Sequence, residues 1–173
     1  PLVGVRILDL THMLAGPYAG MILADLGAET IKVEPLAGEG TRKLLASDPE
    51  NSLDGMGAYY LTLNRNKKSV AIDLKSDSGM AVFSRLVEAS DIVLSNFAAG
   101  VPQPGANRPA FDQVAQASGG GMSITGPDWE HPVRAGIPIG DLGGGMFGVM
   151  GVLAALYERE RSGLGQHIDI AMV

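Results

Sequence analysis

The sequence has no cysteine, no surplus of positive charge and no long hydrophobic run. Without cysteine, a disulfide, a zinc–thiolate site and a cysteine nucleophile are all excluded. The formal net charge is −6, and this acidic balance argues against a nucleic-acid surface, which needs clustered Lys and Arg. The lack of cysteine is also consistent with a cytoplasmic protein.

Membrane and export signals are equally scarce. Residues 1–10 include Arg6 and Asp9 and lack the apolar core of a signal peptide. The longest apolar stretch near the end, residues 146–157, is too short to cross a bilayer. We therefore expect a cytoplasmic protein with neither a membrane nor a nucleic acid as partner.

The composition is that of a globular chain that is rich in glycine. With 173 residues, 46% hydrophobic and 18% charged, the chain can form one domain, and we expect a single domain over residues 1–173. Glycine occurs 24 times, about twice its average usage, with clusters at 119–121 and 143–145. Such clusters permit either tight turns or a ligand lying against the main chain, and spacing alone does not separate the two.

Strand and helix patterns alternate along the first half of the chain. Strand-like patterns occur at residues 5–10, 29–34, 69–74 and 91–95. Between the first two, Pro17 suits a helix start and Gly27 a helix end. After the third, Met80, Phe83, Leu86 and Val87 share a helix face, and Ser76 or Ser78 could cap that helix. This alternation predicts an α/β layered fold with a mainly parallel sheet flanked by helices.

The patterns are less regular in residues 38–57 and in the second half of the chain. Residues 38–57 have no clear period and are expected to form a loop, and residues 111–117 a short helix. An amphipathic helix is predicted from Met146, Val149, Met150, Leu153 and Tyr157, with Arg159 and Arg161 at its negative end. Residues 166–172 alternate like a last strand.

Asp141 is the carboxylate with the most distinctive surroundings. It lies among glycines just before the predicted amphipathic helix, so a bulky reacting group can approach it. A carboxylate can act as a covalent nucleophile, and free N–H groups at a helix N-terminus can bind an oxyanion. Asp is also a favoured helix cap, so capping and catalysis both remain open at this point.

Other candidate groups are less specific. The cations of residues 64–68 (NRNKK) could meet phosphates or form a solvated basic turn. Asn96 and Phe97 follow a strand, where α/β sheets bind ligands, although Asn is also a common turn residue. The histidines show no metal-ligand spacing, and neither G-x-S-x-G nor a P-loop is present, so no metal site is predicted.

Several of these segments together resemble class III CoA-transferases, a family that includes formyl-CoA transferase, carnitine CoA-transferases and alpha-methylacyl-CoA racemase. The similar segments cover most of the chain in family order, and NRNKKSVAIDLK and RERSGLGQHIDIAM are especially distinctive. They are residues 9–35, 59–76, 91–100, 107–126 and 140–172.

The resemblance implies a fold and a mechanism. The fold is the Rossmann-like CoA-binding domain of the family III CoA-transferases, and full-length members form an interlocked homodimer. Asp141 matches the aspartate that attacks an acyl-CoA thioester, forming an aspartyl anhydride and then an aspartyl-CoA thioester. A carboxylic acid then takes the CoA, which serves as substrate, with no prosthetic group. Covalent capture conserves the activation of the thioester.

The resemblance also implies a set of CoA-contacting residues. Lys75 is the best candidate for a charged contact, whereas an arginine that formyl-CoA transferase uses after its second strand is Pro35 here. Its lysine before the short helix is Pro109 here, with Arg108 beside it, so the phosphate contacts are expected to differ. The contact set is Leu14, Ala15, Ile72, Asp73, Leu74, Lys75, Asn96, Phe97, Ala98, Arg108, Pro109, Ala110, Phe111 and Asp112.

Two alternatives to CoA transfer follow from the same resemblance. The racemase branch has a histidine where this chain has Phe111, and proton removal beside a thioester carbonyl needs a base that Phe cannot supply. This favours transfer over racemisation of 2-methylacyl-CoA. The second alternative is a non-catalytic CoA-binding fragment, because family members are longer and carry a second domain and a glycine-rich lid.

The chain departs from the family pattern in one internal place. A helix and a strand are expected between the segments at 91–100 and 107–126, and residues 101–104 (VPQP) stand there instead. A short loop can make such a connection, but it cannot replace a strand. We therefore expect a missing segment near residues 101–104.

Overall fold

The structure is a computed structural model that describes residues 1–97 and 111–172. These residues belong to two compact units, Pro1–Asn96 and Phe97–Val173, and each unit is described by itself. A single domain over the whole chain stays a prediction.

The first unit is built on a four-stranded parallel sheet with the strand order β5-β2-β1-β6. Its strands are β1 (Arg6–Asp9), β2 (Glu29–Glu34), β5 (Lys67–Ala71) and β6 (Ile92–Leu94). Strand β2 has the predicted bounds, whereas β5 begins two residues before the predicted 69–74. With helices on both sides, the sheet confirms the predicted α/β class with a mainly parallel sheet.

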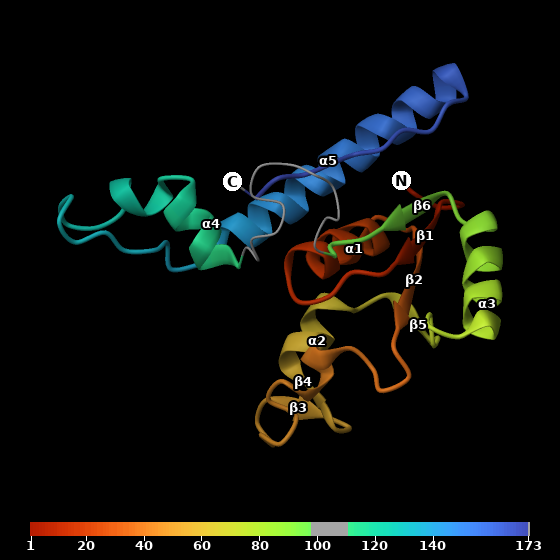
Figure 1. The fold of residues 1–173 in the computed structure, drawn as a ribbon, viewed down its shortest axis with the longest axis horizontal. Coiled ribbons are helices and arrows are strands. Elements are labelled where there is room, and N and C mark those ends of the chain that lie inside the picture. Colours follow the sequence, from red (N-terminus) through yellow and green to blue (C-terminus); the bar gives the residue numbers. More distant parts are fainter. Residues whose placement is uncertain (98–110, 173) are drawn as a thin grey trace. The chain divides into compact units, whose positions relative to one another are not determined.

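Helices α1 (Ala15–Asp25) and α3 (Asp77–Glu88) lie on opposite faces of this sheet (Figure 1). The predicted end of α1 is confirmed, because Gly27 follows it with a φ of +101°. Helix α1 begins two residues before Pro17, the predicted start. Ser76 caps α3, since its hydroxyl accepts a hydrogen bond from the Gly79 N–H at 3.1 Å.

The two faces of the sheet differ in chemistry. Leu8, Val33 and Ile72 form a buried cluster on one face, against which Phe83, Leu86 and Val87 of α3 pack. Full burial of one such leucine contributes about 2 kcal/mol. Because side chains alternate along a strand, Asp9, Lys32 and Glu34 belong to the other face, and they too are buried. Polar contacts therefore contribute to the core on this face, alongside buried apolar side chains such as Ile7 and Leu23.

The chain between β2 and β5 has more structure than the predicted loop at 38–57. The expectation was wrong because an Asp54-Gly55 turn, in which both residues have positive φ, joins two short antiparallel strands. The elements here are η1 (Gly40–Lys43), β3 (Ser52–Leu53), β4 (Met56–Gly57) and α2 (Ala58–Leu63).

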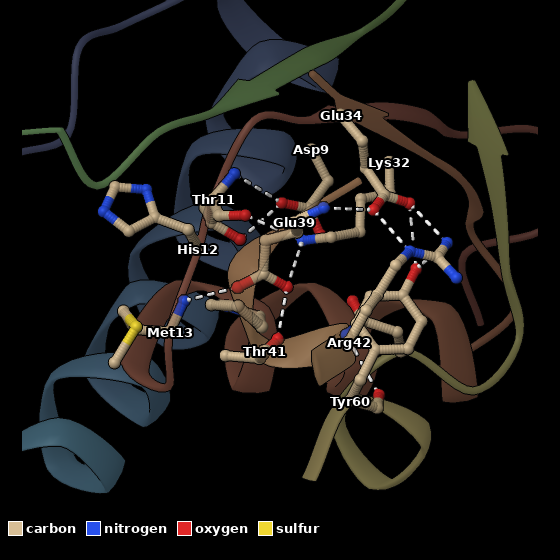
Figure 2. A network of polar contacts seen from close by, with 12 residues as sticks. Asp9, Thr11, His12, Met13, Lys32, Glu34, Glu39, Thr41, Arg42 and Tyr60 are labelled. Atoms are coloured by element: carbon tan, nitrogen blue, oxygen red, sulfur yellow. Dashed lines mark hydrogen bonds and ion pairs between the residues drawn. The ribbon is translucent and has the colours of Figure 1, made fainter. Parts of the chain in front are cut away.

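Glu34 is the centre of the polar contacts at the end of β2 (Figure 2). Its carboxylate accepts two hydrogen bonds from Arg42, each 2.7 Å long, and one from the Tyr60 hydroxyl at 2.9 Å. Burial alone would raise the pKa of Glu34, but the hydrogen bonds from Arg42, Ser69, the Glu39 backbone and Tyr60 lower it to about 2. The charged form is thus the one that the fold requires.

We expect acid to weaken the first unit through Glu34. The pKa of Glu34 is lower in the folded protein, about 2, than its usual 4.5. The stability that this group contributes is therefore complete above pH 4.5 and lost as the pH falls towards 2. Urea unfolding across this range tests the prediction, and Glu34→Gln should be less stable near neutral pH and lose less stability on acidification. Equal acid sensitivity of the two proteins would contradict it.

The second unit contains α4 (Asp112–Ser118), η2 (Gly121–Ile124) and α5 (Ile139–Ser162). Helix α4 confirms the predicted short helix to within one residue. Helix α5 begins well before Met146, so glycines 143–145 are helical and the tight-turn interpretation is wrong for them. With 24 residues, α5 is long and apolar enough to cross a membrane by length and composition alone, unlike the shorter run counted from the sequence.

The predicted last strand at residues 166–172 is wrong. No strand is assigned there, because the segment lies along α5 instead of pairing with a strand in the described part of the chain (Figure 1). A Cβ built on Gly151 would lie 2.8 Å from Ile168, and one built on Gly144 would lie 3.2 Å from Met172. The helix glycines thus let the extended segment approach α5 closely.

Candidate active site

Asp141 lies in the first turn of α5, as its third residue, rather than before the helix. The helix begins at Ile139 after Pro138, and no side chain of its own first residues caps it. Asp141 is half-buried, and no ion pair of its carboxylate is found among residues 1–97 and 111–172. The capping interpretation of Asp141 is therefore wrong.

Asp112 caps α5 from outside. Its Oδ1 atom accepts hydrogen bonds from the backbone N–H groups of Gly140 at 2.8 Å and of Asp141 at 3.4 Å. Its Oδ2 atom accepts a bond from Gln116 Nε2 at 2.7 Å and lies 3.9 Å from Arg134 Nη1. Asp112 is 8% exposed, so the structure makes it a buried partner of the α5 N-terminus.

The backbone N–H groups in the first turn of α5 are not free, because each donates a hydrogen bond within the protein. Ile139 donates to the Ile137 carbonyl at 2.8 Å, and Leu142 donates to the Pro138 carbonyl at 2.9 Å. Asp112 accepts the bonds from Gly140 and Asp141 between them. The expectation that these N–H groups bind an oxyanion is therefore wrong, because each already has an acceptor.

Two carboxylates thus meet at one helix end, and this changes the chemistry of Asp141. Burial raises the pKa of Asp141, and the nearby Asp112 charge raises it further. A carboxylate that has lost part of its hydration beside a second negative charge is a candidate functional group. The positive end of the helix still favours the charged form of both side chains.

The main chain beside Asp141 leaves room for a reacting group. A Cβ built on Gly143 would meet no atom within 4 Å. An open pocket of about 270 Å³ lies next to the two residues before Asp141, lined among others by Ala115, Gln116, Ile139 and Gly140. For glycines 143–145, close approach to the main chain is the interpretation that this geometry allows, whereas Gly120, with a φ of +79°, lies in a turn between α4 and η2.

We expect Asp112→Asn to lower the pKa of Asp141. Asn keeps a side-chain oxygen that can accept the Gly140 N–H bond, but it removes the negative charge that contributes to the raised pKa. The pKa should remain above its usual value, because burial, the larger cause, is unchanged. Carboxyl ¹³C NMR titration measures it, with Glu130→Gln as a charge-matched control. An unchanged Asp141 pKa in Asp112→Asn would contradict the prediction.

In the first unit, predicted contact residues gather at one edge of the sheet. Leu14 and Ala15 begin α1 after β1, Ile72–Lys75 follow β5, and Asn96 follows β6. The carboxyl ends of parallel strands share an edge, so all these segments lie there. The chain leaves β1 towards β2 and returns to β6 on the other side of β1, which makes the gap between β1 and β6 the topological switch point.

The individual side chains at this edge differ in what they can offer. Ile72 is 6% exposed and packs in the apolar cluster, so only its main chain can face a ligand. Leu74 also packs against that cluster. Asp73 accepts a bond from the Lys75 N–H at 3.0 Å and shapes the turn, whereas Lys75 itself is exposed. Lys75 is therefore the side chain here that can reach a phosphate.

The remaining predicted contact residues belong to the second unit or are not described. Phe97 and Phe111 are exposed, at 56% and 63%, and Asp112 is buried as above. Ala98, Arg108, Pro109, Ala110 and the unusual segment 101–104 lie outside the described residues.

The cations of the basic segment at 64–68 are engaged in ion pairs, although Arg65 and Lys68 remain exposed to solvent. Arg65 pairs with Asp25, and Lys68 lies 2.6 Å from the Glu29 carboxylate. Lys67 is buried, with its Nζ atom 2.9 Å from Asp9 Oδ2. The cations of this segment therefore stabilise the sheet and its flanking helix.

Sequence reasoning missed two features of the site. One is the capping bond from Asp112, which joins residues 28 apart in the sequence. The other is the set of buried charges under α1, which the alternating pattern of residues 29–34 does not reveal. No group of three or more His, Asp or Glu side chains in the described ranges could hold a metal ion.

Comparison with known proteins identifies the family. A family model described as "CoA-transferase family III" matches residues 2–104 and 98–173. Succinyl-CoA:mesaconate CoA-transferase of Haloarcula hispanica is 37% identical over 204 residues, which cover 97% of this chain and 50% of that protein. Formyl-CoA:oxalate CoA-transferase of Streptomyces coelicolor is 36% identical over 198 residues, covering 99% and 47%.

Solved structures agree with the sequence comparisons. A CaiB/BaiF family protein from Brucella suis superposes with a TM-score of 0.91 at 32% identity, covering 99% of this chain and 53% of that one. The chain spans about half the length of the curated relatives it matches. The aligned stretch of 204 residues also exceeds the 173 of this chain, so that relative carries residues within it that are missing here.

Proposed function

This chain belongs to CoA-transferase family III, and we propose that the complete protein transfers coenzyme A from an acyl-CoA donor to a carboxylic acid. The names of its relatives describe that type of reaction, with succinyl-CoA and mesaconate in one case and formyl-CoA and oxalate in another. The observation that carries the proposal is the environment of Asp141. Its carboxyl group is half-buried and its pKa is raised, and the space beside the main chain of the nearby Gly143 is free of other atoms.

In the proposed mechanism, an Asp141 oxygen attacks the carbonyl carbon of the acyl-CoA thioester. The C–S bond breaks, CoA leaves as a thiolate, and an aspartyl anhydride forms. The thiolate then attacks the aspartyl carbonyl and releases the donor acid as a carboxylate, which leaves an aspartyl-CoA thioester. The acceptor carboxylate attacks the carbonyl carbon of that thioester, which breaks its C–S bond, releases the CoA thiolate and forms a second anhydride. The thiolate then attacks the acceptor carbonyl of this anhydride, which forms the product thioester and releases Asp141 as a carboxylate.

The surroundings of Asp141 suit this sequence of steps. Burial removes part of the water that would stabilise its charge and hydrolyse the anhydride. Asp112 keeps its own carboxylate bonded to the α5 N-terminus, so it holds the first turn in place while leaving Asp141 unpaired within the described part of the chain. The oxyanion of each tetrahedral intermediate needs donors other than the N–H groups of this first turn.

We place CoA at the carboxyl edge of the sheet in the first unit. Leu14 and Ala15 at the switch point would contact the ligand, and exposed Lys75 would pair with a phosphate. Residues 72–74 would contribute main-chain contacts. The family resemblance implies further contacts from Asn96–Ala98 and Arg108–Asp112, of which Asp112 is buried.

A trapping experiment tests the mechanism. The complete protein, incubated with acyl-CoA and hydroxylamine, should acquire a hydroxamate on Asp141, because hydroxylamine attacks an activated aspartyl carbonyl. Peptide mass spectrometry locates the modification, and a panel of carboxylic acids then identifies the acceptor. CoA binding without any modification or turnover would favour the non-catalytic alternative.

The racemase alternative has its own discriminating measurement. Phe111 cannot remove a proton from the carbon next to the thioester carbonyl. We therefore expect no exchange of the α-proton of 2-methylacyl-CoA in deuterated water when no acceptor acid is present. Exchange under those conditions would identify the protein as a racemase or isomerase.

We propose in addition that the complete protein is a cytoplasmic homodimer. The family resemblance supports the homodimer. The absence of cysteine is consistent with the cytoplasmic location. Light scattering of the complete protein measures the oligomeric state.

A further inference from the structure

Side chains from several elements bind the main chain of residues 11–13, just after β1. The Thr11 N–H donates to Asp9 Oδ1 at 2.9 Å, and the Thr11 carbonyl accepts from Lys32 Nζ at 2.7 Å. The Met13 N–H donates to Glu39 Oε1 at 3.1 Å (Figure 2). This short segment is therefore held by its surroundings rather than by a helix or a strand.

Asn96, which follows the neighbouring strand β6, binds the main chain of His12, the middle residue of this segment. Its Oδ1 atom accepts the His12 N–H at 2.9 Å, and its Nδ2 atom donates to the His12 carbonyl at 2.7 Å. Both polar atoms of the Asn96 side chain are thus engaged by one residue of the main chain. The pair of bonds joins the loop after β6 to the loop after β1 over the switch point.

The segment needs such support because its backbone is strained. Met13 has a φ of +66°, a left-handed conformation that residues other than glycine rarely adopt. Strained residues persist where the surrounding structure fixes them, and they are common at ligand sites. Leu14 and Ala15 follow directly and begin α1, whose N-terminus no side chain caps. The conformation at His12 and Met13 therefore determines where Leu14 and Ala15 lie.

We propose that Asn96 is a positioning residue for CoA: by clamping His12 across the switch point, it places Leu14 and Ala15 for contact with the ligand. This inference rests on the proposed function, in which Leu14 and Ala15 contact CoA. It differs from the contact expected for Asn96 from the family resemblance, because the side-chain amide acts through the main chain of His12. Glu39 and Lys32 support the same segment from the β2 side.

Two measurements on the complete protein test the clamp. In Asn96→Ala, hydrogen exchange of peptides covering residues 11–15 should speed up roughly tenfold, because two hydrogen bonds that hold His12 are lost. The KM for acyl-CoA should rise by about tenfold while kcat at saturation changes little, because the nucleophile is untouched. Asn96→Asp, which keeps the acceptor for the His12 N–H, should show smaller changes in exchange.

Lys75→Ala is the matched control, since Lys75 is proposed to contact the ligand directly. It should raise the KM while leaving the exchange of residues 11–15 unchanged. If Asn96→Ala behaves in the same way, Asn96 contacts CoA itself and the clamp is wrong. Faster exchange with an unchanged KM would also overturn the proposal, because the clamp would then not serve CoA. If the wild-type protein fails to bind CoA, the proposed function fails and the positioning role fails with it, although faster exchange in Asn96→Ala would still show the clamp.

Discussion

Asp141→Ala is expected to lower the rate of CoA transfer by at least a thousandfold, roughly the loss seen when a covalent nucleophile is removed from other enzymes. Without the Asp141 oxygen, the anhydride and the aspartyl-CoA thioester cannot form. Asp112 cannot replace it, because both of its oxygens are engaged, one by the α5 N–H groups and one by Gln116. The initial rate of transfer in the complete protein measures the effect.

Asp141→Asn separates loss of the nucleophile from damage to the fold. The amide has almost the shape of the carboxylate but is a poor nucleophile, so this variant should be as inactive as Asp141→Ala. Both variants should still bind CoA and unfold at the temperature of the wild-type protein or above, because a half-buried charge beside Asp112 has been removed. Transfer at the normal rate in either variant would exclude the proposed mechanism.

The sequence pattern of β2 predicted the strand correctly but gave no indication of its chemistry. Residues 29–34 alternate between charged and apolar side chains, which ordinarily means one solvated face and one buried face. In the structure both faces are buried, since Lys32 is 0% and Glu34 2% exposed. The reason lies outside the strand: Arg42 and Tyr60 reach Glu34, and the Thr11 carbonyl reaches Lys32. Local periodicity contains no information about such distant partners.

For the candidate site, too, part was predicted from the sequence and part was not. The resemblance to class III CoA-transferases identified Asp141, and the periodicity of the apolar residues identified the later part of the helix that contains it. Neither predicted that the helix begins at Ile139, because glycine is a poor helix former and the strong apolar pattern starts only at Met146. The early start depends on Asp112, which satisfies the Gly140 N–H from another helix.

Replacement of Lys67 by methionine is expected to cause the largest loss of stability in the first unit. Its ammonium group donates to Asp9 Oδ2 and to the Pro17 carbonyl, each at 2.9 Å, and its side chain is 1% exposed. Methionine keeps most of the apolar stem but leaves the fully buried Asp9 carboxylate without its cation. Breaking a buried ion pair by removing one partner typically lowers the free energy of unfolding by about 3–5 kcal/mol.

The neighbouring Lys68→Met provides the control for this change. Lys68 makes the same kind of pair, with Glu29 at 2.6 Å, but its side chain is 71% exposed, so water screens the interaction and can replace it. Urea unfolding should show a large shift in midpoint for Lys67→Met and a small one for Lys68→Met. A third variant, Gly20→Ala, approaches the pair from α1, because its Cβ would lie 2.5 Å from Asp9 Oδ2. Alanine ordinarily stabilises a helix relative to glycine by about 1 kcal/mol, so a loss of stability here would show that the helix must stay close to the buried pair. Equal shifts for the two lysine variants would mean that burial of the Asp9–Lys67 pair contributes nothing to the stability of this unit.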